Sequence, residues 1–129
     1  MMKKTLIAFV LSTGFWAVSC SSDDNSPAVN PYEKFQGTWT GTFSGDDQGT
    51  WTVTIDETGT ATGTLESNTM TFPFDLEGQI SENGEVNAEY FIFGVLVGTM
   101  TGIMNETTAS GTWESPEQEM EGIWEGTKN

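Results

Sequence analysis

The chain has 129 residues, of which 19 are Asp or Glu, only 4 are Lys or Arg and none is His, so its formal net charge at pH 7 is −15. Such an acidic chain is repelled by nucleic-acid phosphates and by anionic lipid headgroups, and it lacks the imidazoles of His-based metal sites and of Ser-His nucleophiles. These numbers exclude nucleic-acid binding and those catalytic classes, and the length fits one domain.

The first 19 residues have the pattern of a secretory signal peptide. Lys3 and Lys4 precede an apolar run over residues 6–16, and residues 17–20 read Ala-Val-Ser-Cys. A positive start, a short apolar run and small residues before the cut are typical of signal peptides. The apolar run is shorter than the roughly 20 residues of a membrane-spanning helix. We therefore predict that residues 1–19 are cleaved off.

Residues 17–20 resemble a bacterial lipobox, and this resemblance implies cleavage before Cys20 and attachment of lipid to its thiol. Cys20 is the only cysteine, so it cannot form an internal disulfide, and a free thiol in a secreted chain would be reactive. The alternative is an ordinary free thiol. We expect Cys20 to be the lipid attachment site that anchors the protein to a membrane.

Residues 20–35 are predicted to form a disordered acidic tether. Residues 21–27 read Ser-Ser-Asp-Asp-Asn-Ser-Pro, which is polar and offers nothing to pack. The Ser-Ser-Asp-Asp run after Cys20 resembles the acidic export tag of Bacteroidetes-type surface lipoproteins. The resemblance implies an outer-membrane lipoprotein exposed at the cell surface. The alternative is a solvated spacer with no sorting role.

The remaining segment, residues 36–129, has the alternation of β-strands throughout. Residues 50–55, Thr-Trp-Thr-Val-Thr-Ile, alternate with period two, and turn signals recur about every ten residues. No segment has sustained helical periodicity. Pro73 interrupts the fourth predicted strand and indicates a bulge or an edge there. The pattern predicts eight strands, over residues 38–44, 49–56, 59–66, 69–80, 84–93, 96–104, 107–114 and 119–127.

A repeat of the form apolar-x-Gly-x-apolar recurs in six of these segments, beginning with Trp39-Gly41-Phe43. Alternate residues of a strand share one face, so each glycine leaves a gap between two apolar side chains. Such gaps allow strands to coil and make room for an aromatic ring from a neighbouring strand. Eight coiled strands favour a closed antiparallel up-and-down barrel, because closure removes exposed sheet edges.

Residues 35–39, Phe-Gln-Gly-Thr-Trp, resemble the Gly-x-Trp opening of the calycins, the superfamily of lipocalins and avidins. The later Gly111-Thr112-Trp113 and Gly122-Ile123-Trp124 are similar to it. The resemblance implies a lipocalin-like barrel, as in small domains of bacterial lipoproteins. Lipocalins pack a basic residue near the last strand against the tryptophan, and only Lys128 could do so here.

The core face of the predicted barrel is rich in aromatic residues. A barrel of eight strands either fills with side chains or holds one small ligand. We predict a small apolar or aromatic ligand at the barrel mouth; the alternative is a filled barrel. The expected core is Trp39, Phe43, Trp51, Val53, Phe72, Phe74, Leu76, Tyr90, Ile92, Met100, Met104, Trp113 and Trp124. The candidate ligand-binding residues among them are Trp39, Trp51, Phe72, Phe74 and Tyr90.

Residues 90–97 break the alternation because both faces are apolar. An exposed apolar patch usually marks a partner or a membrane contact. We predict an interaction patch formed by Phe91, Phe93, Leu96 and Val97. The alternative is a hairpin covered by the segment around Tyr32 or by a second copy of the chain.

No catalytic constellation, metal-ligand spacing or cofactor motif is visible, and the acidic residues fall in turns and on exposed strand faces. We therefore expect a non-catalytic protein without cofactor. The leading hypothesis is a lipid-anchored binding module for a small apolar or aromatic ligand. The alternative is an accessory subunit of a surface complex, with a filled barrel.

Overall fold

The computed structural model describes residues 29–129, and the predicted signal peptide, Cys20 and residues 20–28 of the predicted tether lie outside the described residues. The described part is almost entirely β-structure, with two short 3-10 helices, η3 (Glu33–Phe35) and η4 (Pro116–Gln118). The strands are β1 (Gly37–Gly45), β2 (Gly49–Ile55), β3 (Thr60–Ser67), β4 (Phe74–Ile80), β5 (Glu85–Ile92), β6 (Val95–Met104), β7 (Thr108–Ser115) and β8 (Met120–Lys128).

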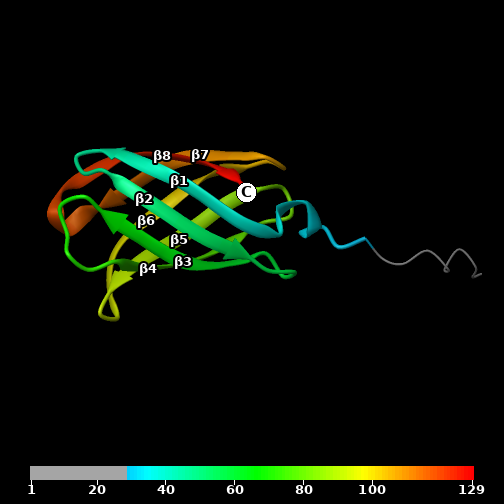
Figure 1. Cartoon of the computed structure of the whole chain (residues 1–129), viewed down its shortest axis with the longest axis horizontal. Coiled ribbons are helices and arrows are strands. Elements are labelled where there is room, and N and C mark those ends of the chain that lie inside the picture. The colour runs from blue at the N-terminus through cyan, green and yellow to red at the C-terminus, as the bar shows by residue number, and fades with distance from the viewer. Residues whose placement is uncertain (1–28) are drawn as a thin grey trace, which may run out of the picture.

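Each strand pairs antiparallel with the next one, and β8 pairs with β1, so the sheet closes on itself (Figure 1). The prediction of an eight-stranded antiparallel up-and-down barrel is confirmed. Within residues 29–129, no helix is both long and apolar enough to cross a bilayer.

The alternation of side chains builds the interior. In β2 every second residue, from Gly49 to Ile55, is buried, and the threonines between them face solvent. Threonine suits these outer positions because a β-branched side chain fits an exposed pleated surface. The same alternation in the other strands produces one continuous core inside the barrel.

The predicted complementarity between glycines and aromatic rings is present in the barrel wall. A Cβ atom at Gly41 would lie 2.6 Å from Cζ2 of Trp51, and one at Gly102 would lie 2.6 Å from Cζ2 of Trp124. Real Cβ atoms do not approach other heavy atoms this closely. The two tryptophan rings therefore occupy space that a side chain at either glycine would need.

The fourth strand is shorter than predicted. It begins at Phe74 rather than at residue 69, and its pairing with β3 starts at Leu65 and Phe74. Proline lacks the N–H that a ladder hydrogen bond needs, so Pro73 precedes the strand instead of interrupting it. Phe72 consequently lies in a loop and is 54% exposed, which makes its assignment to the core wrong. Ile92, also assigned to the core, is only partly buried.

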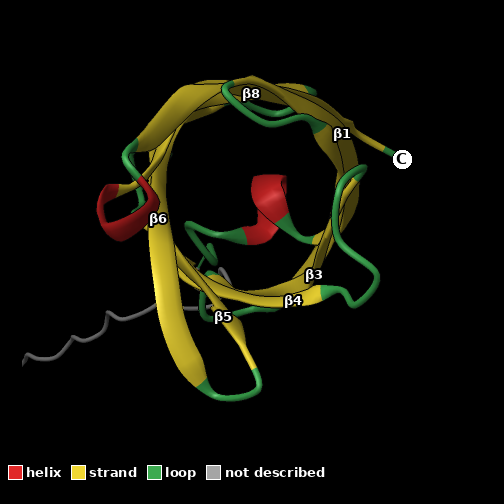
Figure 2. Cartoon of the chain, turned by 90° about the vertical axis from the view of Figure 1, so that its left-hand side faces the viewer, coloured by secondary structure: helices red, strands yellow, loops and turns green. Residues whose placement is uncertain are grey.

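The two ends of the barrel differ. We call the end that carries residues 29–36 and the C-terminus the proximal end (Figure 1). The opposite, distal end carries the turns over residues 46–48, 68–73, 93–94 and 116–119. Seen from the distal end, η3 crosses the far side of the barrel opening (Figure 2).

Residues just before β1 plug the proximal end. Phe35, which the sequence assigned to the tether, is 1% exposed, and its carbonyl oxygen accepts a 2.8 Å hydrogen bond from Nε1 of Trp39. Asn30 donates to the carbonyl oxygen of Glu57 at 3.0 Å. The packed domain therefore includes residues before the predicted boundary at residue 36.

Lys128 does not make the contact with tryptophan that the lipocalin resemblance implies. Its Cα lies opposite that of Trp39 in the β1–β8 pairing, but its Nζ donates a 3.1 Å hydrogen bond to the carbonyl oxygen of Lys34. The lysine that lies over an aromatic ring is Lys34, 5.2 Å from the centroid of Phe35. Lys128 thus forms a hydrogen bond to the backbone of the plug instead of stacking on Trp39.

Candidate functional site

The interior of the barrel contains four of the five residues predicted to bind a ligand: Trp39, Trp51, Phe74 and Tyr90 are all buried. Trp51 packs edge to face on Trp124, with ring centroids 5.7 Å apart, and its Nε1 lies 3.3 Å from the carbonyl oxygen of Thr42. The indole N–H of Trp39 donates to Phe35 and that of Trp51 donates to Thr42. Both tryptophans of the predicted ligand-binding set therefore already have hydrogen-bond partners, as buried indoles require.

Phe74 and Tyr90 form a second edge-to-face pair, with centroids 5.7 Å apart, closer to the distal end. The Tyr90 hydroxyl donates to the carbonyl oxygen of Glu114 at 3.2 Å. Burial raises the pKa of Tyr90 to about 12, so the hydroxyl stays neutral at physiological pH. This hydroxyl acts as a fixed donor to the barrel wall.

Little space remains between these side chains. One cavity of about 30 Å³ lies beside Trp51, Leu76 and Trp124, and another of about 30 Å³ lies beside Phe43 and Tyr90. Since one water molecule needs roughly 10–15 Å³ measured in this way, each cavity has room for at most about two or three waters. The barrel is filled by its own side chains.

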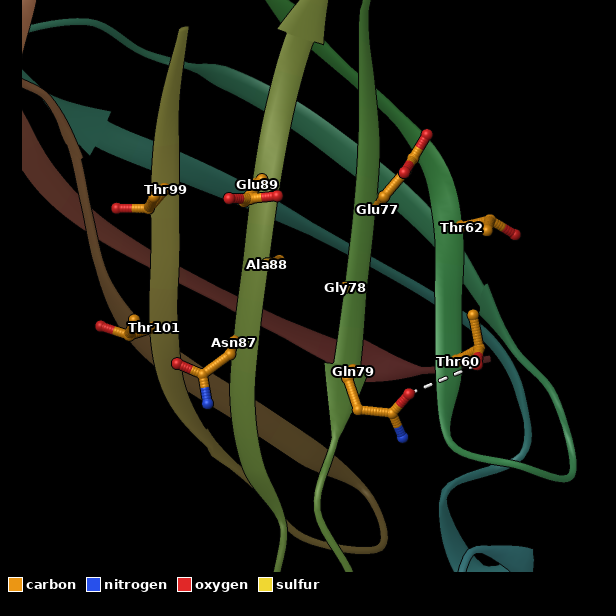
Figure 3. A pocket seen from close by; sticks show the side chains of 10 residues that line it. All are labelled: Thr60, Thr62, Glu77, Gly78, Gln79, Asn87, Ala88, Glu89, Thr99 and Thr101. Carbon is orange, nitrogen blue, oxygen red and sulfur yellow. Dashed lines mark hydrogen bonds between the residues drawn. The ribbon is translucent and has the colours of Figure 1, made fainter. Parts of the chain in front are cut away.

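A groove of about 540 Å³ runs over the outer surface of strands β3 to β6 (Figure 3). Its lining includes Gly78 and Ala88, which are paired across β4 and β5. The side chains around it, including Glu77 and Glu89, spread apart over the strand surface (Figure 3). A built ligand site has convergent polar groups, and this groove lacks them among the described residues.

Apolar side chains gather instead outside the barrel, at the distal end. Phe72, in the loop between β3 and β4, packs edge to face on Phe93 at the end of the β5–β6 hairpin, with centroids 5.4 Å apart. Phe93 is 78% exposed in spite of this contact. We call the exposed apolar residues of these two loops the apolar tip: Met70, Phe72, Phe93, Val95 and Leu96.

The hairpin that carries the tip turns through two residues, Phe93 and Gly94, and extends away from the barrel wall (Figures 1 and 2). Their φ angles are +50° and +83°. Two-residue hairpin turns of this kind favour Asn-Gly or Asp-Gly, because a bulky residue at positive φ is strained. Phe93 therefore holds a position where asparagine would fold more easily, and its ring points into solvent.

The structure separates the four residues of the predicted interaction patch. Phe93 and Leu96 are exposed and belong to the apolar tip, whereas Phe91 and Val97 are half-buried, and Val97 packs against the core. The pairing of β5 with β6 shifts register between Tyr90 and Phe91, as at a β-bulge. This shift redistributes the inward and outward positions of the hairpin, which strict alternation does not anticipate.

Sequence reasoning missed Met70, Phe72 and Val95 as members of the tip. The available signal was Pro73, which ends the ladder and places the residues before it in a loop. That signal shows that Phe72 leaves the barrel interior. The contact between residues 72 and 93 depends on how the two hairpins lie next to each other, and no local pattern encodes it.

Among the described residues, no three acidic side chains come close enough together to hold a metal ion. Comparison of the chain with protein-family models, with curated proteins and with solved structures finds no match. The features of this barrel that bear on its function are therefore a filled interior and an apolar tip at the distal end.

Proposed function

We propose that the protein is a non-catalytic interaction module, anchored by lipid at Cys20 to the outer membrane and exposed at the cell surface, that docks a partner through its apolar tip. The observation that carries the proposal is the pairing of Phe72 with Phe93 outside the barrel, with both rings largely exposed. Exposed aromatic and aliphatic side chains that cluster in this way mark interaction surfaces.

The placement of the tip agrees with an anchor at Cys20. The described chain begins at the proximal end, and the tip lies at the distal end (Figure 1). An anchor that precedes residue 29 would attach the barrel to the membrane through its proximal end. The tip is at the end farther from this attachment point, where a partner can reach it.

The strained turn gives a second line of support. Residues held at unfavourable φ angles cost free energy and persist where function requires them. At position 93 an asparagine would satisfy the turn, but it would not provide a large apolar surface. The presence of phenylalanine at this position is explained if its ring contacts a partner.

The test is a comparison of full-length variants in the cells that produce the protein. We expect the double variant Phe72→Ser, Phe93→Asn to lose its cross-linked or co-purified complex while its melting temperature stays within a few degrees of the original. The matched control is Ile103→Ser, because Ile103 is also exposed but lies near the proximal end of β6. Loss of the complex in the control alone, or retention in the double variant, would refute docking through the tip.

A second candidate function is the binding of a small apolar or aromatic molecule inside the barrel. The observation in its favour is the apolar cavity beside Trp51 and Trp124. Occupation by a ligand would require these side chains to move, because the cavity is only about 30 Å³. Native mass spectrometry after incubation with a cell extract tests this candidate, and a discrete added mass would favour the barrel interior over the tip.

A further inference from the structure

The two ends of the barrel differ in where their positive charges lie. Within residues 29–129 the cationic side chains are Lys34 and Lys128, and both lie at the proximal end, where they contact the plug around Phe35. Carboxylates lie at both ends of the barrel; the proximal ones include Asp56, Glu57, Glu82 and Glu106. Within the same residues, the distal turns and the adjoining ends of the strands carry carboxylates and no lysine or arginine. The distal carboxylates are Asp46, Asp47, Glu66, Asp75, Glu89, Glu114, Glu117, Glu119 and Glu121.

Two of these carboxylates lie next to the apolar tip. The Cα atom of Asp75 is paired with that of Phe91, at the base of the β5–β6 hairpin. Glu89 precedes Phe91 by two residues on β5 and is exposed. The apolar tip therefore lies next to two carboxylates, and both lysines of residues 29–129 lie at the opposite end of the barrel.

Some acidic residues also occupy paired backbone positions on neighbouring strands. Glu77 is directly opposite Glu89, and Glu114 is directly opposite Glu121. Like charges in directly opposed positions destabilise a sheet. A cation brought by a partner would relieve this repulsion, so the arrangement favours binding of positive charge at the distal end.

Resting on the proposed docking function, we infer that the partner of the apolar tip is a protein segment with an apolar pocket that is bordered by lysine or arginine. Phe93 and Leu96 would fill the pocket, and Asp75 and Glu89 would face the basic border. This division into an apolar centre and a charged rim is typical of specific protein interfaces.

The charge distribution disfavours the other occupants of the tip. A second copy of the chain would bring two acidic distal ends together, and the carboxylates would repel one another. An anionic bilayer surface would repel the same residues. A basic protein segment satisfies both the apolar tip and the carboxylates around it.

The experiment is photo-cross-linking of the full-length protein in the cells that produce it. The photoreactive residue p-benzoylphenylalanine replaces Phe72 or Phe93 in separate samples, and Ile103 in the control sample. Cross-linked peptides are mapped by mass spectrometry. The cross-link is then measured again in Asp75→Lys, Glu89→Lys and in the matched proximal variant Glu57→Lys, Glu106→Lys, whose residues are also exposed.

We expect cross-links from positions 72 and 93 to one protein segment that contains both apolar residues and several lysines or arginines. The distal charge reversal should lower the yield roughly fivefold or more, and the proximal reversal should leave it unchanged. A cross-link to a second copy, to lipid or to an acidic or neutral segment would overturn the basic partner but keep docking through the tip. An unchanged cross-link yield in Asp75→Lys, Glu89→Lys would also overturn the basic partner and keep docking through the tip. No cross-link above the position 103 control would overturn both proposals.

Discussion

Phe72 and Phe93 come from the loops of different hairpins, and their rings meet edge to face at 5.4 Å outside the barrel. The pair is exposed on its remaining surfaces, so it is an addition to the core and not a part of it. Edge-to-face pairs contribute about 0.5–1.5 kcal/mol when they are well packed. The contact therefore holds the two loops in a defined arrangement and leaves most of each ring free.

The first prediction concerns the strain in the turn at Phe93. Phe93→Asn and Phe93→Ala both remove the contact with Phe72, but asparagine tolerates positive φ better than alanine does. We expect the asparagine variant to be more stable than the alanine variant by about 0.5–1 kcal/mol in urea unfolding. Equal stability of the two variants would show that residue 93 is not strained.

The second prediction concerns the close packing of Trp124 on Gly102. A Cβ atom at position 102 would overlap the carbonyl oxygen of Ser110 and lie 2.6 Å from Cζ2 of Trp124, so Gly102→Ala forces the ring or the backbone to shift. We expect a loss of about 1–3 kcal/mol in the free energy of unfolding. Thr101→Ala, on the outer face of the same strand, is the control and should cost less than about 1 kcal/mol. Similar losses in both variants would argue against close packing of Gly102 on the β7 backbone and on Trp124.

The third prediction concerns the contribution of the plug at the proximal end to stability. Phe35→Ala empties a fully buried position next to Trp39, and we expect it to lower the free energy of unfolding by about 3–5 kcal/mol. The exposed neighbour Glu33 provides the control, because Glu33→Ala should change stability by about 0.5 kcal/mol or less. Thermal unfolding followed by tryptophan fluorescence measures both. A neutral effect of Phe35→Ala would mean that the barrel does not need its plug.

The fourth prediction concerns the effect of the buried Tyr90 hydroxyl on stability at high pH. Burial raises its pKa from 10.0 to about 12 in the folded protein, so the unfolded chain ionises first as the pH rises. The stabilisation by neutral Tyr90 is complete below pH 10 and is lost as the pH rises towards 12. We expect the melting temperature of the original protein to fall more steeply from pH 9 to pH 12 than that of Tyr90→Phe. Parallel pH profiles of the two proteins would contradict the raised pKa.

The architecture could be predicted because its determinants are local. The alternation of threonine with apolar residues in segments such as residues 50–55 specifies an inner and an outer face, whatever the neighbouring strand is. Glycines between apolar residues, as at Gly41, indicate where a ring must approach the backbone. These two patterns were sufficient to predict eight strands and a closed barrel, which the structure confirms.

The predictions failed where a local signal ends a strand or where contacts between distant segments decide the burial of a side chain. Phe72 fits the alternation of a strand, but Pro73 ends the ladder, so the side chain leaves the interior. Phe35 lies among polar residues and had no pattern of its own, yet it is buried because the open barrel end needs an apolar cover. The bulge after Tyr90 likewise depends on the pairing of β5 with β6 and not on either strand alone.

The acidic charge, the signal-like leader ending at Cys20 and the β-periodicity of residues 37–128 follow from the sequence by itself, because each depends on residue types at short spacing. Only the tertiary structure decided that the aromatic side chains fill the barrel, because filling depends on the volumes that eight strands enclose together. It also decided that residues 70–72 and 93–96 form one apolar tip on an acidic end. That arrangement results from barrel closure, which brings distant loops together and places both lysines of the described range at the opposite end.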